Sequence, residues 1–190
     1  AYRTQILFDT NQMMQQAQDR NQIITAMANQ LGKLLGKNII VYLEQEGNLG
    51  EPHLFWQEGK EENQSCTGEK ERQVAQWVWE HNRRAGAFTR NFPECQCLYL
   101  AIRINEQVYG VVGIVMEDSR MDDFVNSIVL SILGECALAL ESEKNAREKE
   151  EAAILAKNEQ LRANLLRAIS HDLRTPLTSI SGNASNLMAN

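Results

Sequence analysis

Apolar and polar residues alternate with two different periods along the chain, and these periods separate predicted helices from predicted strands. Between residues 11 and 36, apolar positions recur every three or four residues, which predicts one amphipathic helix. Residues 1–8 are a possible backward extension of it. A second helix is predicted over residues 69–84, where Val74, Trp77 and Val78 share one helical face.

Strands are predicted where β-branched residues cluster or where apolar residues alternate with polar ones. The predicted strands are 38–44, 53–57, 97–104 and 107–116. The predicted breaks and loops are 45–50, 58–68 and 85–93. The last two strands, joined by Asn105–Glu106, form the clearest hairpin signal in the chain.

The chain after Asp118 has the pattern of a long helix. Residues 135–175 contain neither Gly nor Pro, and such a helix would be about 60 Å long. Its middle part, residues 141–153, carries almost no apolar stripe, so it needs a partner helix or must bridge two domains. The predicted fold class is therefore α+β: an antiparallel sheet flanked by helices, followed by a long C-terminal helix.

Composition and charge exclude several classes of protein. The chain has 190 residues and a formal net charge of −6, and without a large basic face it is not expected to bind nucleic acid. No uninterrupted apolar run approaches the roughly 18 residues of a membrane span, and the first residue is Ala. We therefore expect a piece of a longer chain with no membrane segment of its own. Four cysteines are too few for a disulfide scaffold and favour a reducing cytosol.

A heptad assigned to the last helix places one histidine in an unusual position. With Leu166 at position a, Ile169 falls at d and Leu173 at the next a, which predicts a paired coil. His171 then falls at f, the most exposed position, and Asp172 at g beside the seam. An exposed helical histidine on its own is usually only a solvated side chain.

Proline five residues after His171 changes this interpretation. Pro176 lacks an N–H and clashes with the carbonyl group of Asp172, at a cost of about 3 kcal/mol in an ordinary helix. This predicts a functional hinge. The alternative, a helix that ends there, fits less well because the apolar stripe continues to Leu187.

Residues 171–182, HDLRTPLTSISG, are similar to the phosphoacceptor box of bacterial sensor histidine kinases. The longer stretch 165–187 resembles the Kdp potassium-responsive family of these kinases. The preceding part resembles a GAF domain in its element order and in its hairpin ending at 108–117. The resemblance implies four parts: a leading helix or linker (1–12), a GAF-like sensor domain (13–136), a signalling helix linker (137–160), and a truncated HisKA dimerisation and phosphoacceptor helix (161–190).

The resemblance also implies roles for individual residues. His171 would be the phosphoacceptor, Asp172 would orient its ring and assist transfer, and Thr175 would position water for dephosphorylation of the response regulator. A neutral imidazole is a suitable nucleophile for this step. Pro176 would be the hinge. The family's ATP-binding domain has no counterpart here, so this chain alone should be inactive and hold no cofactor, while the full-length kinase uses ATP and Mg²⁺.

The implied partners are a second copy of the chain, bound through the C-terminal helix, and the receiver domain of a response regulator. The implied setting is the cytoplasmic portion of a membrane-embedded bacterial sensor that responds to potassium or osmotic stress. The GAF-like part would bias the long helix mechanically. Adjacent Leu165 and Leu166 belong to two apolar stripes that are rotated relative to each other around the helix. Small rotations of the helix are therefore one way to transmit the signal. Loose packing in a short helical bundle explains the two stripes equally well.

The ligand of the GAF-like part cannot be read from the sequence. Six aromatic residues are candidates for a pocket, although core packing or ordinary surface explains each: Phe55, Trp56, Trp77, Trp79, Tyr99 and Tyr109. No histidine has neighbours at metal-ligand spacing, so no metal site is expected. Two other functions stay open: a thiol enzyme resembling free methionine sulfoxide reductases, using Cys66, Cys95 and Cys97, and a purely structural dimerisation module.

Overall fold

A computed structural model describes residues 1–62 and 64–189, with side chains placed as far as Thr175. The chain divides into two compact units, residues 1–144 and 145–190. The first unit contains the sheet and the helices packed on it. The second unit consists of the continuing C-terminal helix.

The first unit is built around a five-stranded antiparallel sheet with strand order β2-β1-β5-β4-β3. The elements in chain order are α1 (Tyr2–Gln16), α2 (Arg20–Leu35), β1 (Ile39–Gln45), β2 (Asn48–Phe55), the 3₁₀ turn η1 (Gln64–Thr67), α3 (Glu69–His81), β3 (Ala85–Gly86), β4 (Cys97–Ile104), β5 (Gln107–Val115) and α4 (Asp123–Ala189). The predicted α+β class, with its antiparallel sheet and long final helix, is confirmed.

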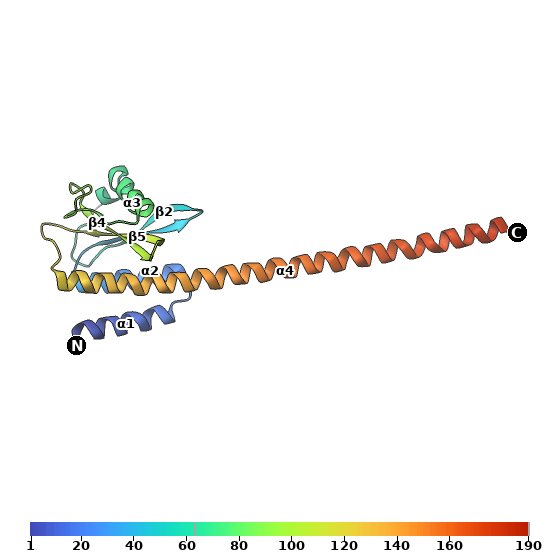
Figure 1. The fold of residues 1–190 in the computed structure, drawn as a ribbon, viewed down its shortest axis with the longest axis horizontal. Helices are drawn as coiled ribbons and strands as arrows, with labels where there is room; N and C mark the ends of the chain where they lie inside the picture. Colours follow the sequence, from blue (N-terminus) through green and yellow to red (C-terminus); the bar gives the residue numbers. More distant parts are fainter. Residues whose placement is uncertain (63, 190) are drawn as a thin grey trace. The chain divides into compact units, whose positions relative to one another are not determined.

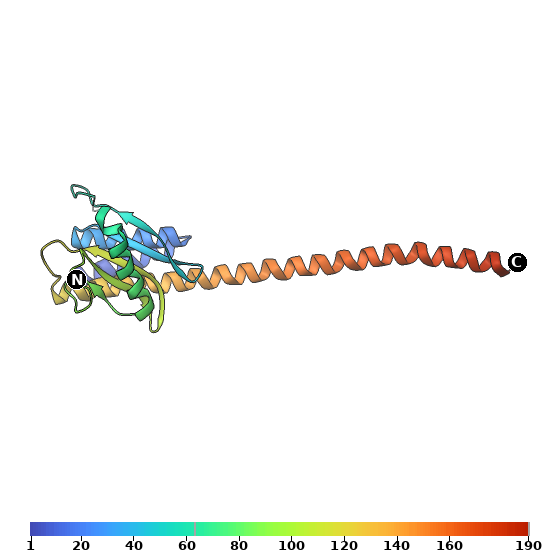
Figure 2. The ribbon, with the colours of Figure 1, turned by 90° about the horizontal axis from the view of Figure 1, so that it is seen from above.

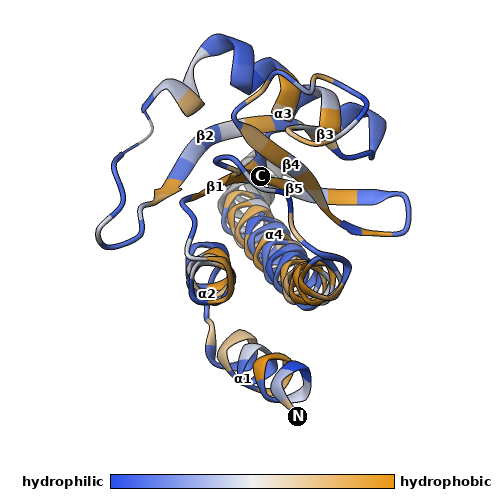
Figure 3. Cartoon of the chain, turned by 90° about the vertical axis from the view of Figure 1, so that its left-hand side faces the viewer, coloured by the Kyte–Doolittle hydropathy of each residue, from blue (hydrophilic) through white to orange (hydrophobic). Residues whose placement is uncertain are grey.

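Helices cover both faces of the sheet. Helices α2 and the first part of α4 lie side by side on one face, and α3 lies on the other (Figures 1 and 3). Helix α3 contacts β4 and β5, and the view from above in Figure 2 shows it crossing the sheet. Helix α1 packs outside α2, away from the sheet (Figure 3). The sheet is therefore buried between two apolar cores.

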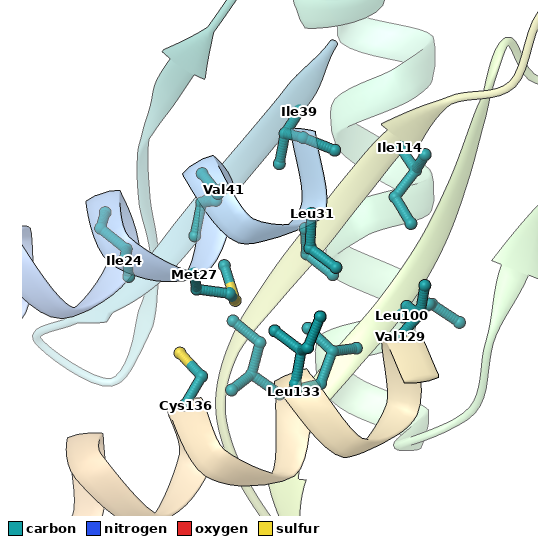
Figure 4. Close-up of a cluster of buried hydrophobic side chains, with 14 of the residues drawn as sticks. Ile24, Met27, Leu31, Ile39, Val41, Leu100, Ile114, Val129, Leu133 and Cys136 are labelled. Atoms are coloured by element: carbon teal, nitrogen blue, oxygen red, sulfur yellow. The ribbon is translucent and has the colours of Figure 1, made fainter. Parts of the chain in front are cut away.

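The larger core joins α2, the sheet and α4 (Figure 4). Met27 and Leu31 of α2 have no exposed surface, and neither do Ile39 of β1 and Ile114 of β5. Leu133 of α4 is only 3% exposed among them. Helix α4 is thus an integral part of the folded unit before it continues into the second unit.

The single helix predicted over residues 11–36 is wrong, because the chain forms two helices there. Ala17 is extended (φ −70°, ψ 134°) and ends α1. Asp19 then begins α2, and its carboxylate accepts a hydrogen bond from the backbone N–H of Gln22 at 2.9 Å. This capping bond stabilises a new helix start inside an otherwise continuous apolar pattern.

Two predicted loops also contain strand residues. Strand β2 begins at Asn48, because Glu46 and Gly47 form a two-residue turn with positive φ angles of 53° and 83°. Ala85 and Gly86 pair with Tyr99 and Leu98 and form the short strand β3. A Cβ atom at Gly86 would lie 2.2 Å from the carbonyl oxygen of Cys97, so only glycine fits this close approach.

Helix α4 is continuous through the polar stretch of its sequence. Its segment Asp123–Thr175 is long and apolar enough, by length and composition alone, to cross a membrane. Part of that apolar segment is buried in the core of the first unit, and a buried core helix can have the same length and composition. The segment is therefore weak evidence for a membrane span. Helix α4 includes Pro176, whose side chain is outside the described part of the structure. The functional hinge expected at this residue stays a prediction.

Candidate functional site

His171 lies on a part of α4 where every residue from 148 to 175 is exposed. The side chains of His171 and Asp172 are 80% and 83% exposed. Nδ1 of His171 and Oδ1 of Asp172 are 3.7 Å apart, which is close enough for electrostatic interaction but longer than a hydrogen bond. The imidazole is therefore open to a large partner, with a carboxylate beside its Nδ1 atom.

Thr175 lies one helical turn after His171. Its hydroxyl group donates a hydrogen bond to the carbonyl oxygen of His171 at 3.2 Å. This bond uses the hydroxyl hydrogen and leaves the oxygen able to accept a further hydrogen bond. The three predicted residues thus lie within about one turn of helix, as their sequence spacing requires.

The predicted seam of the helix is exposed in the single chain. Leu166, Ile169 and Leu173 are 56%, 46% and 61% exposed, although each is a large apolar residue. Leu161 and Leu165, which belong to the other, rotated stripe, are exposed to a similar extent. An apolar stripe in water is unfavourable, and such a stripe is typical of a helix that pairs with another helix.

The aromatic residues proposed as a ligand pocket have separate surroundings. Tyr99 is fully buried, and its hydroxyl group donates a hydrogen bond to Glu71 at 2.9 Å. Trp77 stacks on His81 with ring centroids 4.3 Å apart. None of the six residues is among those lining the cavity beside α2 or the cavity beside the start of α4. Core packing explains Tyr99, and stacking on His81 explains Trp77.

A buried carboxylate on the α3 side of the sheet is a feature that the sequence analysis missed. Glu71 is only 7% exposed, and besides Tyr99 it accepts a bond from the backbone N–H of Cys97 at 3.3 Å. Its spacing could have revealed it, because Glu71 falls on the same helical face as Val74 and Val78.

Three cysteines lie around this carboxylate. Cys66 and Cys97 are fully buried, and Cys95 is half-buried. Burial, together with the neighbouring Glu71 carboxylate, raises the pKa of Cys95 to about 12. A hydrogen bond between the thiols of Cys66 and Cys97 lowers the pKa of Cys66 and raises that of Cys97. In the described residues no group of three or more His, Cys, Asp or Glu side chains could hold a metal ion.

These surroundings predict unreactive thiols in the folded chain. We expect iodoacetamide at pH 8 to label Cys66, Cys95 and Cys97 at least about tenfold more slowly in buffer than in urea, because two are buried and the third is held as a thiol. Quantitative mass spectrometry of each peptide measures the rates. Fast native labelling of Cys66, with a midpoint well below pH 8.5 and lost in Cys66→Ser, would instead favour the thiol enzyme.

Comparison with protein families finds a match for the part of the chain that contains His171. The family model for the His Kinase A (phospho-acceptor) domain matches residues 161–190, which include His171. The chain is also similar to the sensor protein KdpD of Clostridium acetobutylicum, at 29% identity over 189 residues, or 99% of this chain. It is 34% identical over 120 residues, 58% of this chain, to KdpD of Escherichia coli. The chain spans only 21% and 13% of the lengths of these relatives.

Solved structures resemble the first unit. The GAF domain of the Escherichia coli potassium sensor histidine kinase KdpD has a TM-score of 0.63, at 18% identity over 77% of this chain and 98% of that one. A GAF domain from an Acinetobacter phosphoenolpyruvate-protein phosphotransferase has a TM-score of 0.53, at 12% identity over 75% of this chain and 94% of that one. At these identities the likeness shows a common fold, which is the GAF fold.

Proposed function

We propose that this chain, a KdpD-like sensor kinase fragment in which a GAF domain precedes a HisKA region, relays a signal to a phosphoacceptor histidine. The first unit would take up the signal, and α4 would carry it to His171. In the full-length kinase His171 would accept a phosphoryl group from ATP and pass it to an aspartate of a response regulator.

The observation that carries this proposal is the position of His171. It lies within the residues that match the phospho-acceptor domain, and its ring is 80% exposed. A side chain that must meet first an ATP-binding domain and then a receiver domain needs this openness. A histidine with a packing role would be buried against neighbouring side chains.

The surroundings of the ring suit nucleophilic attack by its Nε2 atom. A neutral imidazole that carries its proton on Nδ1 has a free electron pair on Nε2. As the new N–P bond forms, the bond from the γ-phosphorus to the bridging oxygen breaks, and ADP leaves. The ring then loses its Nδ1 proton, and Asp172, 3.7 Å away, is placed to help remove it.

Contacts within the first unit support a mechanical relay. The hydroxyl group of Tyr109, on β5, donates a hydrogen bond to Glu141 of α4 at 3.0 Å. From α1, the side-chain amide of Asn11 donates to Glu135 of α4 at 3.1 Å. Both the sheet and α1 thus hold α4 through side chains close to the point where the helix leaves the unit. A change in either would act on the helix.

The partners and the location are part of the proposal. The chain would form a homodimer through the seam of Leu166, Ile169 and Leu173, and it would meet a receiver domain at His171. It would belong to the cytoplasmic portion of a bacterial membrane sensor that responds to potassium or osmotic stress. ATP and Mg²⁺ would be needed by the full-length kinase.

The direct test is phosphoryl transfer to the chain. We expect radiolabelled ATP with Mg²⁺, incubated with a full-length kinase that contains this sequence, to label the peptide that carries His171. The label should be stable in alkali and labile in acid, as a phosphorus–nitrogen bond is. A purely structural dimerisation module predicts no label on this peptide.

A substitution in the seam tests the dimer. We expect the chain to sediment as a dimer, and we expect Leu166→Glu to weaken association at least about tenfold, because it brings two charges into an apolar seam. The matched control is Ala168→Glu, which adds the same charge at heptad position c, outside the seam. Analytical ultracentrifugation measures both variants. A strictly monomeric wild-type chain at high concentration would contradict the proposed dimer.

A further inference from the structure

A small cavity in the first unit lies where the loop after β3 meets the start of α4. It has a volume of about 130 Å³. Its apolar lining residues include Leu98, Met116 and Met121. Asn126, from the first turns of α4, forms part of the wall. The cavity is therefore bounded both by the sheet edge and by the helix that leaves the unit.

Two arginines from separate segments line this cavity. Arg84 follows α3, and Arg120 lies in the link between β5 and α4. Within the described part of the chain, neither guanidinium has a hydrogen bond or an ion pair. The single acidic residue in the lining is Asp123, so the lining carries a net positive charge. The carboxylate of nearby Asp122 accepts the N–H of Val125 at 2.8 Å and is engaged there.

The lining also includes an aromatic residue, Phe88. Phe88 is 48% exposed although it is a large apolar residue, and its φ angle of 62° is unusual for a bulky side chain. The loop is fixed in this form by Thr89, whose hydroxyl oxygen lies 2.7 Å from the carbonyl oxygen of Gly86 and 2.8 Å from that of Asn91. Phe88, one of the residues lining the cavity, is thus held by a well-bonded loop.

We propose that this cavity binds a small organic anion, with its carboxylate or phosphate between Arg84 and Arg120 and its flat apolar part on Phe88. Guanidinium groups bind both anions through paired hydrogen bonds, and they also stack on flat groups. The volume is well below the 300–1,000 Å³ typical of pockets for larger ligands, so the ligand is the size of a single ring rather than a nucleotide.

Binding here would act on the start of α4. An anion held by Arg84 and Arg120 would tie the loop after β3 to the link before α4, while Asn126 is already part of the helix. A regulatory effect on His171 rests on the proposed function, but binding itself does not.

Calorimetry on the 190-residue chain tests the site, with phenyl phosphate and benzoate as probes. We expect at least one of them to bind once per chain, at least about tenfold more tightly than inorganic phosphate or neutral benzyl alcohol. Arg84→Gln and Arg120→Gln should each weaken binding at least about tenfold, because each removes one guanidinium. Arg83→Gln is the matched control, since this exposed neighbour is outside the lining, and its affinity should equal that of the wild type.

A second variant tests the aromatic part. Phe88→Asn keeps a side chain that tolerates the left-handed backbone but removes the ring, so it should abolish the advantage over inorganic phosphate. The proposal is overturned if neither probe binds saturably, or if Arg84→Gln and Arg83→Gln bind equally well. His171→Gln should bind as the wild type does, so failure of the phosphoacceptor proposal and failure of this one can be told apart.

Discussion

Replacing His171 with glutamine should reduce phosphorylation of the chain to background. Glutamine is similar in size and polarity, but it has no nucleophilic ring nitrogen that can form a bond to phosphorus. The effect should be complete rather than partial, because no other side chain can form that bond at the same place. The measurement is incorporation of radiolabel from ATP in the presence of Mg²⁺ and a full-length kinase that contains this sequence.

A second histidine provides the matched control for this experiment. His81, at the end of α3, is also exposed, but its ring stacks on Trp77 rather than standing free. We expect His81→Gln to leave labelling unchanged. Label that persists at the wild-type level in His171→Gln would show that the phosphoryl group is carried elsewhere, and the proposed relay would then lose its end point.

Replacing Leu133 with alanine should strongly destabilise the first unit. Leu133 lies on α4, is 3% exposed and is packed with residues of α2 and the sheet in the larger core (Figure 4). Removing its branched side chain leaves a cavity in close-packed surroundings, so we expect the free energy of unfolding to fall by about 2–5 kcal/mol. Urea denaturation followed by circular dichroism measures this loss.

The same helix supplies the control for this substitution. Leu130, three residues earlier, is 44% exposed, so Leu130→Ala should change the free energy of unfolding by only about 0.5 kcal/mol. Equal losses in the two variants would contradict the burial pattern described for α4. A large loss confined to Leu133→Ala would indicate that the helix carrying His171 is anchored in the core of the first unit.

Several predictions from local pattern were accurate because they depend on neighbouring residues. The β4–β5 hairpin follows from alternating apolar residues and a two-residue turn, and the structure has it with strands Cys97–Ile104 and Gln107–Val115. The long helix follows from an absence of residues that break helices. His171, Asp172 and Thr175 lie together for the same reason, because helical spacing alone brings them within one turn.

Other features were missed because they depend on contacts between distant residues. Ala85 and Gly86 form a strand only because β4 offers them a backbone partner. Glu71 is buried because Tyr99 and the N–H of Cys97, more than twenty residues away, satisfy its carboxylate. The break between α1 and α2 was predictable in part. Asp19 is a residue type that often caps the start of a helix, but it lies within a continuous apolar pattern that favours a single helix.

The sequence by itself determined the fold class, the long helix and the exposed heptad position of His171, because periodicity and local spacing fix these through the geometry of helices and strands. Only the tertiary structure decided the strand order, the division of the apolar residues between two cores, and the meeting of Arg84, Phe88 and Arg120 around one cavity. Those features arise when segments far apart in the chain pack together, and no local pattern specifies which segments will meet.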